Sequence, residues 1–333
     1  MKKLTFLLIA TLTAILLAAC GDSTSDTDSS NQDEALSIYT TVYPLQYFAE
    51  RIGGDFVNAQ SIYPAGSNEH TFEPTTKDMM KLSDADLFFY IGLGLEGFVD
   101  SAESTLKGTN VKLVPTANNV SEEDLHTSTG HTHAEAIEEH GHDHEHEADE
   151  HGHNHEEGAE EHDAHVWLSP LIAQQLAAVI KDELVAKLPE QADLFEANYE
   201  ALVTDLSTLH EEFETMATAT TSKTFFVSHA AFGYYAGLYG FQQVPIAGLN
   251  SQSEPSQKEL MAIVDFAKEE NIQTIFFEQN VTSKLASIIQ DEIGATTATL
   301  HNLSVLTEDD ITNNEDYFTL MRANLHALQK ALQ

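Results

Sequence analysis

The stretch that decides the fold is residues 170–216, which read "PLIAQQLAAVIKDELVAKLPEQADLFEANYEALVTDLSTLHEEFETM". Pro189 divides this stretch into two helices, because proline interrupts a helix interior. In the second helix the apolar residues recur at steps of three and four, at Leu194, Phe195, Tyr199, Leu202, Leu206, Leu209, Phe213 and Met216. About 27 helical residues at ~1.5 Å each make a rod of about 40 Å. We therefore expect a stiff helix that joins two lobes.

Short apolar runs and helical patterns alternate on both sides of this stretch. Before it we expect strands at 36–41, 57–63, 86–91 and 111–114, with helices at 44–53, 75–85 and 95–106. After it we expect strands at 224–228, 241–246, 272–277 and 296–300, with helices at 231–240, 255–271, 283–294 and 316–333. Alternation of this kind predicts an α/β fold with parallel sheets covered by helices. A cleft should lie between the two lobes.

The N-terminus predicts export and a lipid anchor. "MKK" is followed by an apolar run that ends in "LLAAC", and Cys20 is the only cysteine in the chain. This pattern resembles a bacterial lipoprotein signal, which implies lipidation of Cys20. The alternative is an ordinary secretory signal that happens to contain a cysteine. Residues 21–35 are polar and rich in Ser and Asp, as a flexible tether would be.

The domain organisation that we expect follows from these patterns. Residues 1–19 form a lipoprotein signal peptide, and 20–36 a lipidated flexible tether. Residues 37–168 form an N-terminal α/β lobe, 169–217 the linking helices, and 218–333 a C-terminal α/β lobe. The N-terminal lobe contains a disordered His-rich insertion at 121–163.

The chain has 15 Lys+Arg against 54 Asp+Glu, a formal charge of -39, which argues against nucleic acid as a partner.

The insertion at 121–163 holds 11 of the 17 histidines and 16 acidic residues, without any Lys or Arg. It lacks the apolar residues needed to bury surface, so we expect it not to fold. Three interpretations are open: a weak metal collector, a solvated acidic insertion, and a pH-responsive tail. We favour the collector. A tight site needs preorganised ligands, so we do not place the principal site here.

Three histidines lie in ordered contexts outside the low-complexity run. His165 is in "DAHVWLSP", where Ser169 and Pro170 should begin a helix. His70, in "GSNEHTFEP", and His229, in "FFVSHAAFG", each come directly after a predicted strand. Ligands of open α/β sheets bind at the carboxyl ends of strands. Three imidazoles converging there would suit zinc, whereas manganese normally takes more oxygen ligands. His210, His301 and His326 have contexts more typical of packing or surface residues.

Five stretches carry a resemblance to a known family. They are "YPLQYFAERIGGD", "HTFEPTTKDMMKLSDADLFFYIGLGLE", "HVWLSP", "SHAAFGYYAGLYG" and "EPSQKELMAIVDFAKEENIQTIFFE". The chain resembles the metal-specific solute-binding proteins of ABC importers, in the zinc and manganese cluster, and most of all their high-affinity zinc-uptake branch. The resemblance covers nearly the whole mature chain and implies two four-stranded lobes joined by a rigid helix. It implies His70, His165 and His229 as metal ligands and Zn2+ as the bound ion.

The fourth ligand is open at this point. The family often has a carboxylate after the last strand, where this chain has Ser304. The candidates are water, Glu69 and Glu278. Glu69 stands where the family usually has proline, and would either approach the metal or face solvent. Glu278 ends a predicted strand, and would be either a direct ligand or a carboxylate that supports one.

The function that we expect is capture of extracellular Zn2+ and delivery to an ABC permease and its ATPase. The protein should be a monomer, held by its lipid on the outer face of the bacterial cell membrane. Loop movement rather than wide hinge closure should accompany binding, and affinity should fall from about pH 7 to about pH 5. The alternatives are a binder of manganese or another divalent metal, and a surface metal buffer or adhesin. A zinc hydrolase is disfavoured because the sequence has no HExxH motif.

Overall fold

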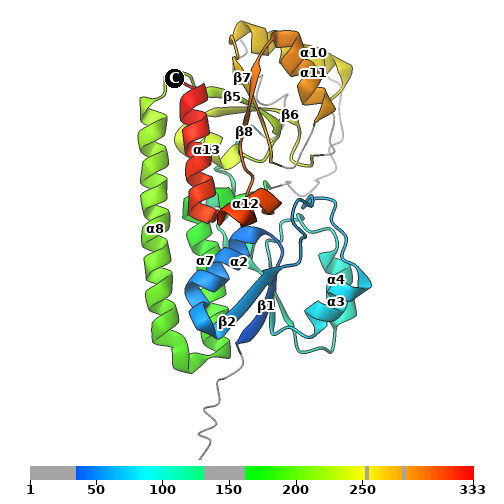
Figure 1. Cartoon of the computed structure of the whole chain (residues 1–333), viewed down its shortest axis with the longest axis vertical. Helices are drawn as coiled ribbons and strands as arrows, with labels where there is room; N and C mark the ends of the chain where they lie inside the picture. The colour runs from blue at the N-terminus through cyan, green and yellow to red at the C-terminus, as the bar shows by residue number, and fades with distance from the viewer. Residues whose placement is uncertain (1–34, 131–161, 252–254, 280–282) are drawn as a thin grey trace, which may run out of the picture. The chain divides into compact units, whose positions relative to one another are not determined.

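The computed structural model of the chain describes residues 35–130, 162–251, 255–279 and 283–333 (Figure 1). The predictions for the signal peptide, Cys20 and most of the tether concern residues 1–34, and those for most of the His-rich insertion concern 131–161. Both ranges lie outside the described residues. Within the described ranges, no helix combines the length and the apolar content needed to cross a membrane.

The first lobe is a four-stranded parallel sheet with helices packed against it. Its strands run in the order β2-β1-β3-β4, with bounds β1 Leu36–Thr40, β2 Val57–Ser61, β3 Leu87–Tyr90 and β4 Lys112–Pro115. Its helices are α2 Tyr43–Gly53, α3 Thr76–Ser83 and α4 Val99–Leu106. Helix α4 begins four residues later than predicted, since residues 95–98 continue the loop and turn that start at the positive-φ residues 92–94.

The second lobe repeats the arrangement. Its parallel strands run in the order β6-β5-β7-β8, with bounds β5 Thr224–His229, β6 Gln242–Ala247, β7 Thr274–Phe277 and β8 Thr296–Thr299. Its helices are α9 Gly233–Tyr239, α10 Gln257–Glu269 and α11 Lys284–Ile293, and the short helix α12 Glu308–Asn313 that follows β8 lies beside α2 of the first lobe (Figure 1). In both sheets the chain reverses its direction of winding beside the first strand, and this is where open α/β sheets bind ligands.

Two long helices join the lobes, as the sequence predicts. Helix α7 spans Pro170–Lys187 and α8 spans Ala192–Ala219, a rod of 28 residues beside both lobes (Figure 1). Ser169 caps α7, because its side chain accepts a hydrogen bond from the backbone N–H of Ile172. The C-terminal helix α13, Tyr317–Ala331, packs against α8.

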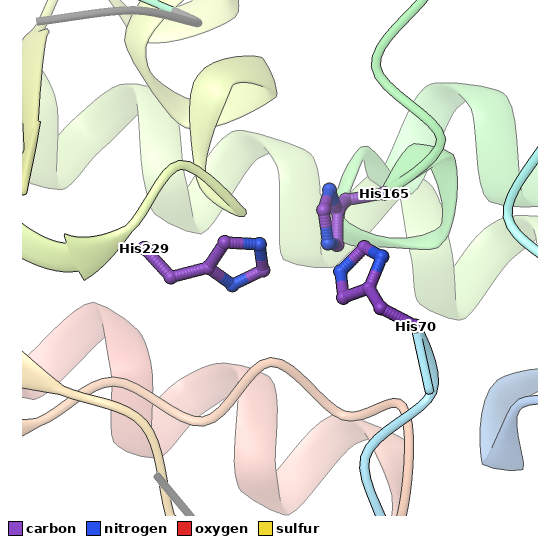
Figure 2. Close-up of side chains that lie close together, drawn as sticks. All are labelled: His70, His165 and His229. Carbon is purple, nitrogen blue, oxygen red and sulfur yellow. The ribbon is translucent and has the colours of Figure 1, made fainter. Parts of the chain in front are cut away.

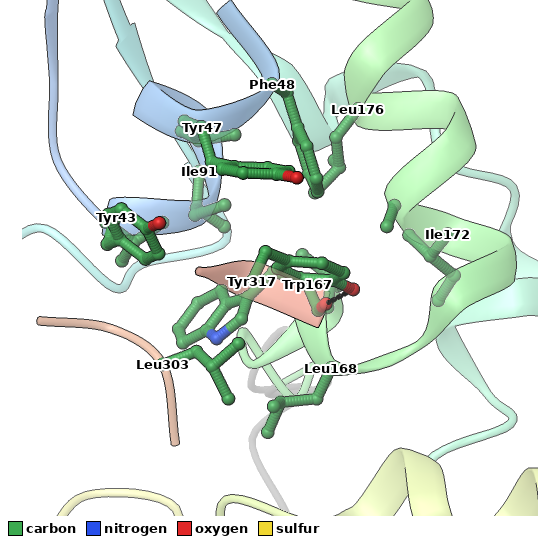
Figure 3. Packing of buried hydrophobic residues seen from close by; sticks show 14 of the residues in the cluster. Tyr43, Tyr47, Phe48, Ile91, Trp167, Leu168, Ile172, Leu176, Leu303 and Tyr317 are labelled. Atoms are coloured by element: carbon green, nitrogen blue, oxygen red, sulfur yellow. Dashed lines mark hydrogen bonds between the residues drawn. The ribbon is translucent and has the colours of Figure 1, made fainter. Parts of the chain in front are cut away.

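A continuous hydrophobic core runs from the first lobe through the bridging helices into the second. Trp167 lies at its centre, fully buried, and its indole N–H donates to the carbonyl of Asn302 at 2.7 Å. The hydroxyl of Tyr317 donates to the carbonyl of Trp167 at 2.8 Å (Figure 3). Because one densely packed core is shared, the lobes are held together by side-chain contacts as well as by α8.

The first ten residues of the His-rich insertion are folded, so our prediction that disorder begins at 121 is wrong. Helix α5, Glu122–Leu125, is capped by Ser121 and buries Leu125. The chain then docks on α9: a side chain at Gly237 would place its Cβ 1.4 Å from the carbonyl oxygen of Thr127. Contacts with the second lobe thus supply the burial that the local composition lacks.

Candidate metal centre

Three imidazole rings from distant parts of the chain converge between the lobes. The ring centroids of His70, His165 and His229 are between 5.0 and 5.3 Å apart. One ligand atom from each residue lies within 4.8 Å of the other two. Figure 2 shows the rings turned toward one another. The structure therefore brings together the three histidines that the sequence singles out.

Each histidine is positioned by a different local structure. His229 is the last residue of β5, in register with Ala247 of β6. His165 immediately precedes the short helix 166–168 that leads into α7. His70 lies in a turn nine residues beyond the end of β2, and not directly after the strand as predicted. The side chain of Asn68 fixes this turn by accepting a hydrogen bond from the His70 N–H at 3.0 Å.

Asp163 orients His165, a role that our sequence reasoning missed. One of its carboxylate oxygens accepts from the backbone N–H of His165 at 2.9 Å and lies 2.7 Å from Nδ1. The hydroxyl of Ser128 donates to the other oxygen. Burial alone would raise the pKa of Asp163, but the His165 ring and these donors together lower it. Since Nδ1 carries the proton toward Asp163, Nε2 is left as the metal-binding nitrogen.

Two of the ring nitrogens have no hydrogen-bond partner among the described residues. They are Nε2 of His70 and Nε2 of His165, and both are buried. Buried polar atoms are nearly always partnered, so each of these calls for a ligand. Burial, followed by the neighbouring rings of His165 and His229, lowers the pKa of His70 to about 2. His70 is therefore neutral and able to donate its lone pair to a cation.

His229 differs from the other two rings because both of its nitrogens face acceptors. Nδ1 lies 2.6 Å from Oε1 of Glu278, and Nε2 lies 2.8 Å from the carbonyl oxygen of Leu249. Burial lowers the pKa of His229, but Glu278 outweighs it and brings the pKa to about 9. Without metal the ring carries two protons at neutral pH. A cation would displace one of them, together with the bond to Leu249.

The two candidate carboxylates lie behind the triad. Glu278 contacts Nδ1 of His229, which leaves Nε2 for the metal. A carboxylate in this position orients the ring without itself binding the ion. Glu69 is 5% exposed, so the alternative that it faces solvent is wrong. It accepts a hydrogen bond from the Asn302 side chain at 2.9 Å, and the same oxygen is 3.9 Å from Nε2 of His70. Burial and the charge of Glu278 raise the pKa of Glu69. Ser304 instead donates to Asn302 and braces it.

Two of the three histidines, His70 and His165, line a cavity of about 270 Å³ with walls from both lobes. His70 and the loop 93–97 line it from the first lobe, and Leu249 and Asn250 from the second. His162, at the end of the insertion, also lines this cavity. His210 and His301 are engaged elsewhere: His210 bonds to the Tyr239 hydroxyl and His301 to Asp310.

The fold and the site together define a class of protein. Two α/β lobes with a shared core and a nitrogen triad between them describe a protein that binds a metal ion. The chain matches, over residues 38–331, the family model described as ZnuA, zinc-uptake complex component A, periplasmic. The chain belongs to this family, which is a class of transporter binding proteins and not of enzymes.

Relatives of known name agree with this assignment. The chain is 33% identical over 331 residues to the high-affinity zinc uptake system protein ZnuA of Bacillus subtilis, covering 99% of this chain and 98% of that protein. It is 35% identical over 338 residues to the zinc-binding lipoprotein AdcA of Streptococcus pneumoniae, covering 99% of this chain but 61% of AdcA. The Streptococcus pneumoniae protein thus extends well beyond the region that this chain matches.

Solved structures show the same fold. The Zn(II)-bound ZnuA-like domain of Streptococcus pneumoniae AdcA has a TM-score of 0.70 at 31% identity, covering 90% of this chain and 99% of that one. The laminin-binding protein Lmb of Streptococcus agalactiae, described as having adhesin and metal-transporting activity, has a TM-score of 0.74 at 28% identity. It covers 90% of this chain and 100% of Lmb.

Proposed function

We propose that this protein captures Zn2+ between its lobes, through His70, His165 and His229, and delivers it to an ABC importer. The observation that carries the proposal is the pair of buried, unpartnered Nε2 atoms beside a third imidazole. Zinc takes imidazole ligands in tetrahedral geometry, with one position left for water or an oxygen. Three nitrogens held in a buried cluster match that preference.

The ligand set favours zinc over manganese. Manganese prefers carboxylate, carbonyl and water oxygens, whereas imidazole suits zinc. Within the described residues, the cluster of potential metal ligands consists of three imidazoles and includes no carboxylate. We propose that Glu278 acts through His229, and that water or Glu69 fills the fourth position. To bind the ion, the Glu69 carboxylate oxygen would have to move from its present position, 3.9 Å from Nε2 of His70.

The partners follow from the family and from the N-terminal sequence. As component A of an uptake complex, the protein would release zinc to a membrane permease driven by an ATPase. Lipidation of Cys20, with residues 20–36 as a tether, would hold it as a monomer at the outer face of the cell membrane. The shared core favours release through local movement of the cavity loops over separation of the lobes.

The test is zinc titration of the full mature chain, read by the fluorescence of Trp167. This is the only tryptophan, and its ring lies 5.4 Å from the ring of His165, so its signal reports on the triad. His70→Ala removes one ligand without orphaning a hydrogen-bond partner, and should abolish the tight phase. His326→Ala, exposed on α13, is the matched control. Unchanged tight binding in His70→Ala would refute the proposal.

A surface metal buffer or adhesin remains the competing function. It predicts the same zinc titration but no dependence of cellular zinc uptake on this protein. Uptake of radioactive zinc by cells that lack the chain, with and without re-expression, separates the two. Normal uptake without the chain would favour the buffer or adhesin.

A further inference from the structure

The buried carboxylate beside His70 is hydrogen-bonded to the opposite lobe. Glu69, in the first lobe, accepts at 2.9 Å from Nδ2 of Asn302, which follows β8 in the second lobe. The same oxygen of Glu69 lies 3.9 Å from Nε2 of His70. Ligand atoms around a tetrahedral zinc stand about 3.4 Å apart, so a small shift would make this oxygen a ligand. Asn302 therefore holds an oxygen donor just outside the coordination shell of an ion bound by the three imidazoles.

The orientation of the Asn302 amide is determined by its other neighbours. Its Oδ1 accepts from the backbone N–H of Ser304 at 3.0 Å and from the Ser304 hydroxyl at 2.8 Å. It also accepts from the side chain of Gln279 at 2.8 Å. Because a backbone N–H can only donate, the amide atom that faces Ser304 must be the oxygen. The NH2 group is thereby directed at Glu69, and rotating it away would break these three hydrogen bonds.

The backbone of Asn302 is fixed as firmly as its side chain. Its N–H donates to the side chain of Gln279 at 3.1 Å, and its carbonyl accepts from the indole of Trp167 at 2.7 Å. The next residue, Leu303, donates its N–H to Nδ1 of His301 at 2.9 Å. Asn302 itself is 2% exposed. Densely bonded buried networks hold their members in one arrangement. Asn302 is therefore a rigid donor, and only the carboxylate that it holds has to move for that carboxylate to bind metal.

Holding this carboxylate back affects which metal the site prefers. The potential ligands that cluster among the described residues are three imidazoles, a set that suits zinc. A carboxylate added to this set would favour manganese more than zinc, because manganese prefers oxygen ligands. A hydrogen bond to a charged acceptor shifts an equilibrium by about 10- to 100-fold. The bond from Asn302 is thus strong enough to decide whether Glu69 or water takes the fourth position.

We propose that Asn302 is a specificity-determining residue: it keeps the Glu69 carboxylate out of the coordination shell, so that water completes the zinc site. Asn302 does not touch the ion and acts as a positioning residue, through Glu69. The inference rests on the zinc binding proposed above and chooses between the two fourth ligands left open there. Absence of zinc binding would refute the proposed function, whereas a direct bond from Glu69 to zinc would overturn only this inference.

The experiment measures the ratio of the dissociation constants of Mn2+ and Zn2+ in the full mature chain, at about pH 8, where carboxyl groups are normally ionised. Chelator competition gives the constant for zinc, and the electron paramagnetic resonance signal of free Mn2+ gives that for manganese. Both ions carry two charges, so a change of charge near the site affects them alike and leaves the ratio in place. A change of stability alone also leaves the ratio in place.

Asn302→Asp is the first variant. It keeps the oxygen that Ser304 and Gln279 bond, and replaces only the NH2 group that faces Glu69 with a second acceptor. The carboxylate of Glu69 is then released and repelled toward the imidazoles. We expect the ratio to fall by more than about threefold, and on the order of tenfold. A smaller fall would overturn the proposal.

Two further variants separate Glu69 from Asn302. In Asn302→Asp/Glu69→Gln the hydrogen bond is restored with its direction reversed, and the formal charge equals that of the unaltered protein. We expect the ratio to return to within about threefold of the unaltered value, since a hydrogen bond of this kind is worth more than that. A ratio that stays low would overturn the proposal, because the new carboxylate would then be acting by itself.

Glu69→Gln alone tests whether Glu69 is already a ligand in the unaltered protein. Its amide oxygen still accepts from Asn302, so the network is kept. We expect the ratio to stay within about threefold, because the carboxylate removed was not in the coordination shell. A larger rise would show that Glu69 binds the ion, and would overturn the inference while leaving zinc capture by the three histidines intact.

Discussion

The two sheets of this protein have the same strand order, yet their equivalent crevices hold different chemistry. In the first lobe, the crevice between β1 and β3 is filled by Glu96, which is 6% exposed. Its carboxylate accepts hydrogen bonds from the Thr41 hydroxyl at 2.7 Å and from the N–H groups of Ile91 and Gly92 at 2.8 and 3.0 Å. In the second lobe, the crevice between β5 and β7 holds His229 and Glu278, paired at 2.6 Å.

The comparison shows how one topology supports two roles. In the first crevice the protein supplies its own anion to the strand-end N–H groups, so no ligand is needed there. Glu96 thereby holds the loop whose residues 93–95 line the metal cavity, including Leu93 at a φ of 54°. In the second crevice the carboxylate is bonded to an imidazole of the triad. Topology locates both crevices, and the side chains decide which one binds metal.

His229→Ala should have the largest effect on zinc binding. It removes one of three nitrogens and leaves Glu278 buried without its partner. Loss of a residue that only hydrogen-bonds a metal ligand costs ~10–100-fold in affinity. Loss of the ligand itself should therefore cost more than about 100-fold. Competition with a zinc chelator, read at Trp167, measures this. A loss smaller than that of Glu278→Gln would contradict the assignment of His229 as a ligand.

Glu278→Gln should weaken zinc binding by about 10- to 100-fold. The amide still reaches Nδ1 but no longer supplies the charge that makes the ring a stronger base. Because the charge of Glu278 outweighs the effect of burial, the pKa of His229 should fall in this variant. The same chelator competition measures the affinity, and NMR of the ring measures the pKa. An unchanged pKa of His229 would contradict the claim that Glu278 raises it.

Zinc affinity of the unaltered protein should rise with pH up to about 9. Below its pKa of about 9, His229 holds a proton that zinc must displace. Apparent affinity should therefore fall about tenfold for each pH unit below that value, as one proton is released per ion bound. This window lies above the range of about pH 5 to 7 that the sequence alone suggests. Affinity measured from pH 9 to 7 checks it, and a flat profile there would contradict it.

Glu96→Gln should leave zinc affinity within about threefold of the unaltered value while lowering stability by about 1–3 kcal/mol. Glutamine has only one acceptor oxygen, so at least one of the three donors would face the amide NH2. Chelator competition and chemical denaturation separate the two effects. A loss of affinity as large as that of Glu278→Gln would show that the two crevices are not functionally distinct.

The pH dependence of stability offers a smaller effect at the same residue. Burial raises the pKa of Glu96 to about 6, so the folded state binds this proton more tightly than the unfolded state. Stability should therefore fall by about 2 kcal/mol in total as pH rises from well below 4.5 to well above 6. The difference in unfolding free energy between the unaltered protein and Glu96→Gln, measured across this range, isolates the contribution. A constant difference would contradict it.

Much of the fold was predictable because it rests on local patterns. The break at Pro189 and the apolar spacing of 192–216 give α7 and α8, and the alternation of strands and helices gives both sheets. The three histidines stood out because each lies beside an apolar, ordered segment. The folded base of the insertion was missed, since residues 121–130 are stabilised by contacts with α9 and β6 rather than by their own composition.

The sequence by itself determined the class of fold, the long bridging helix and which imidazoles stand apart from the His-rich run. Only the tertiary structure decided the roles of the carboxylates. Asp163 orients His165, Glu278 raises the pKa of His229, and Glu69 lies buried against Asn302. The physical reason is that ionisation and orientation depend on distance and burial. These follow from the packing of segments far apart in the chain and leave no mark in local sequence.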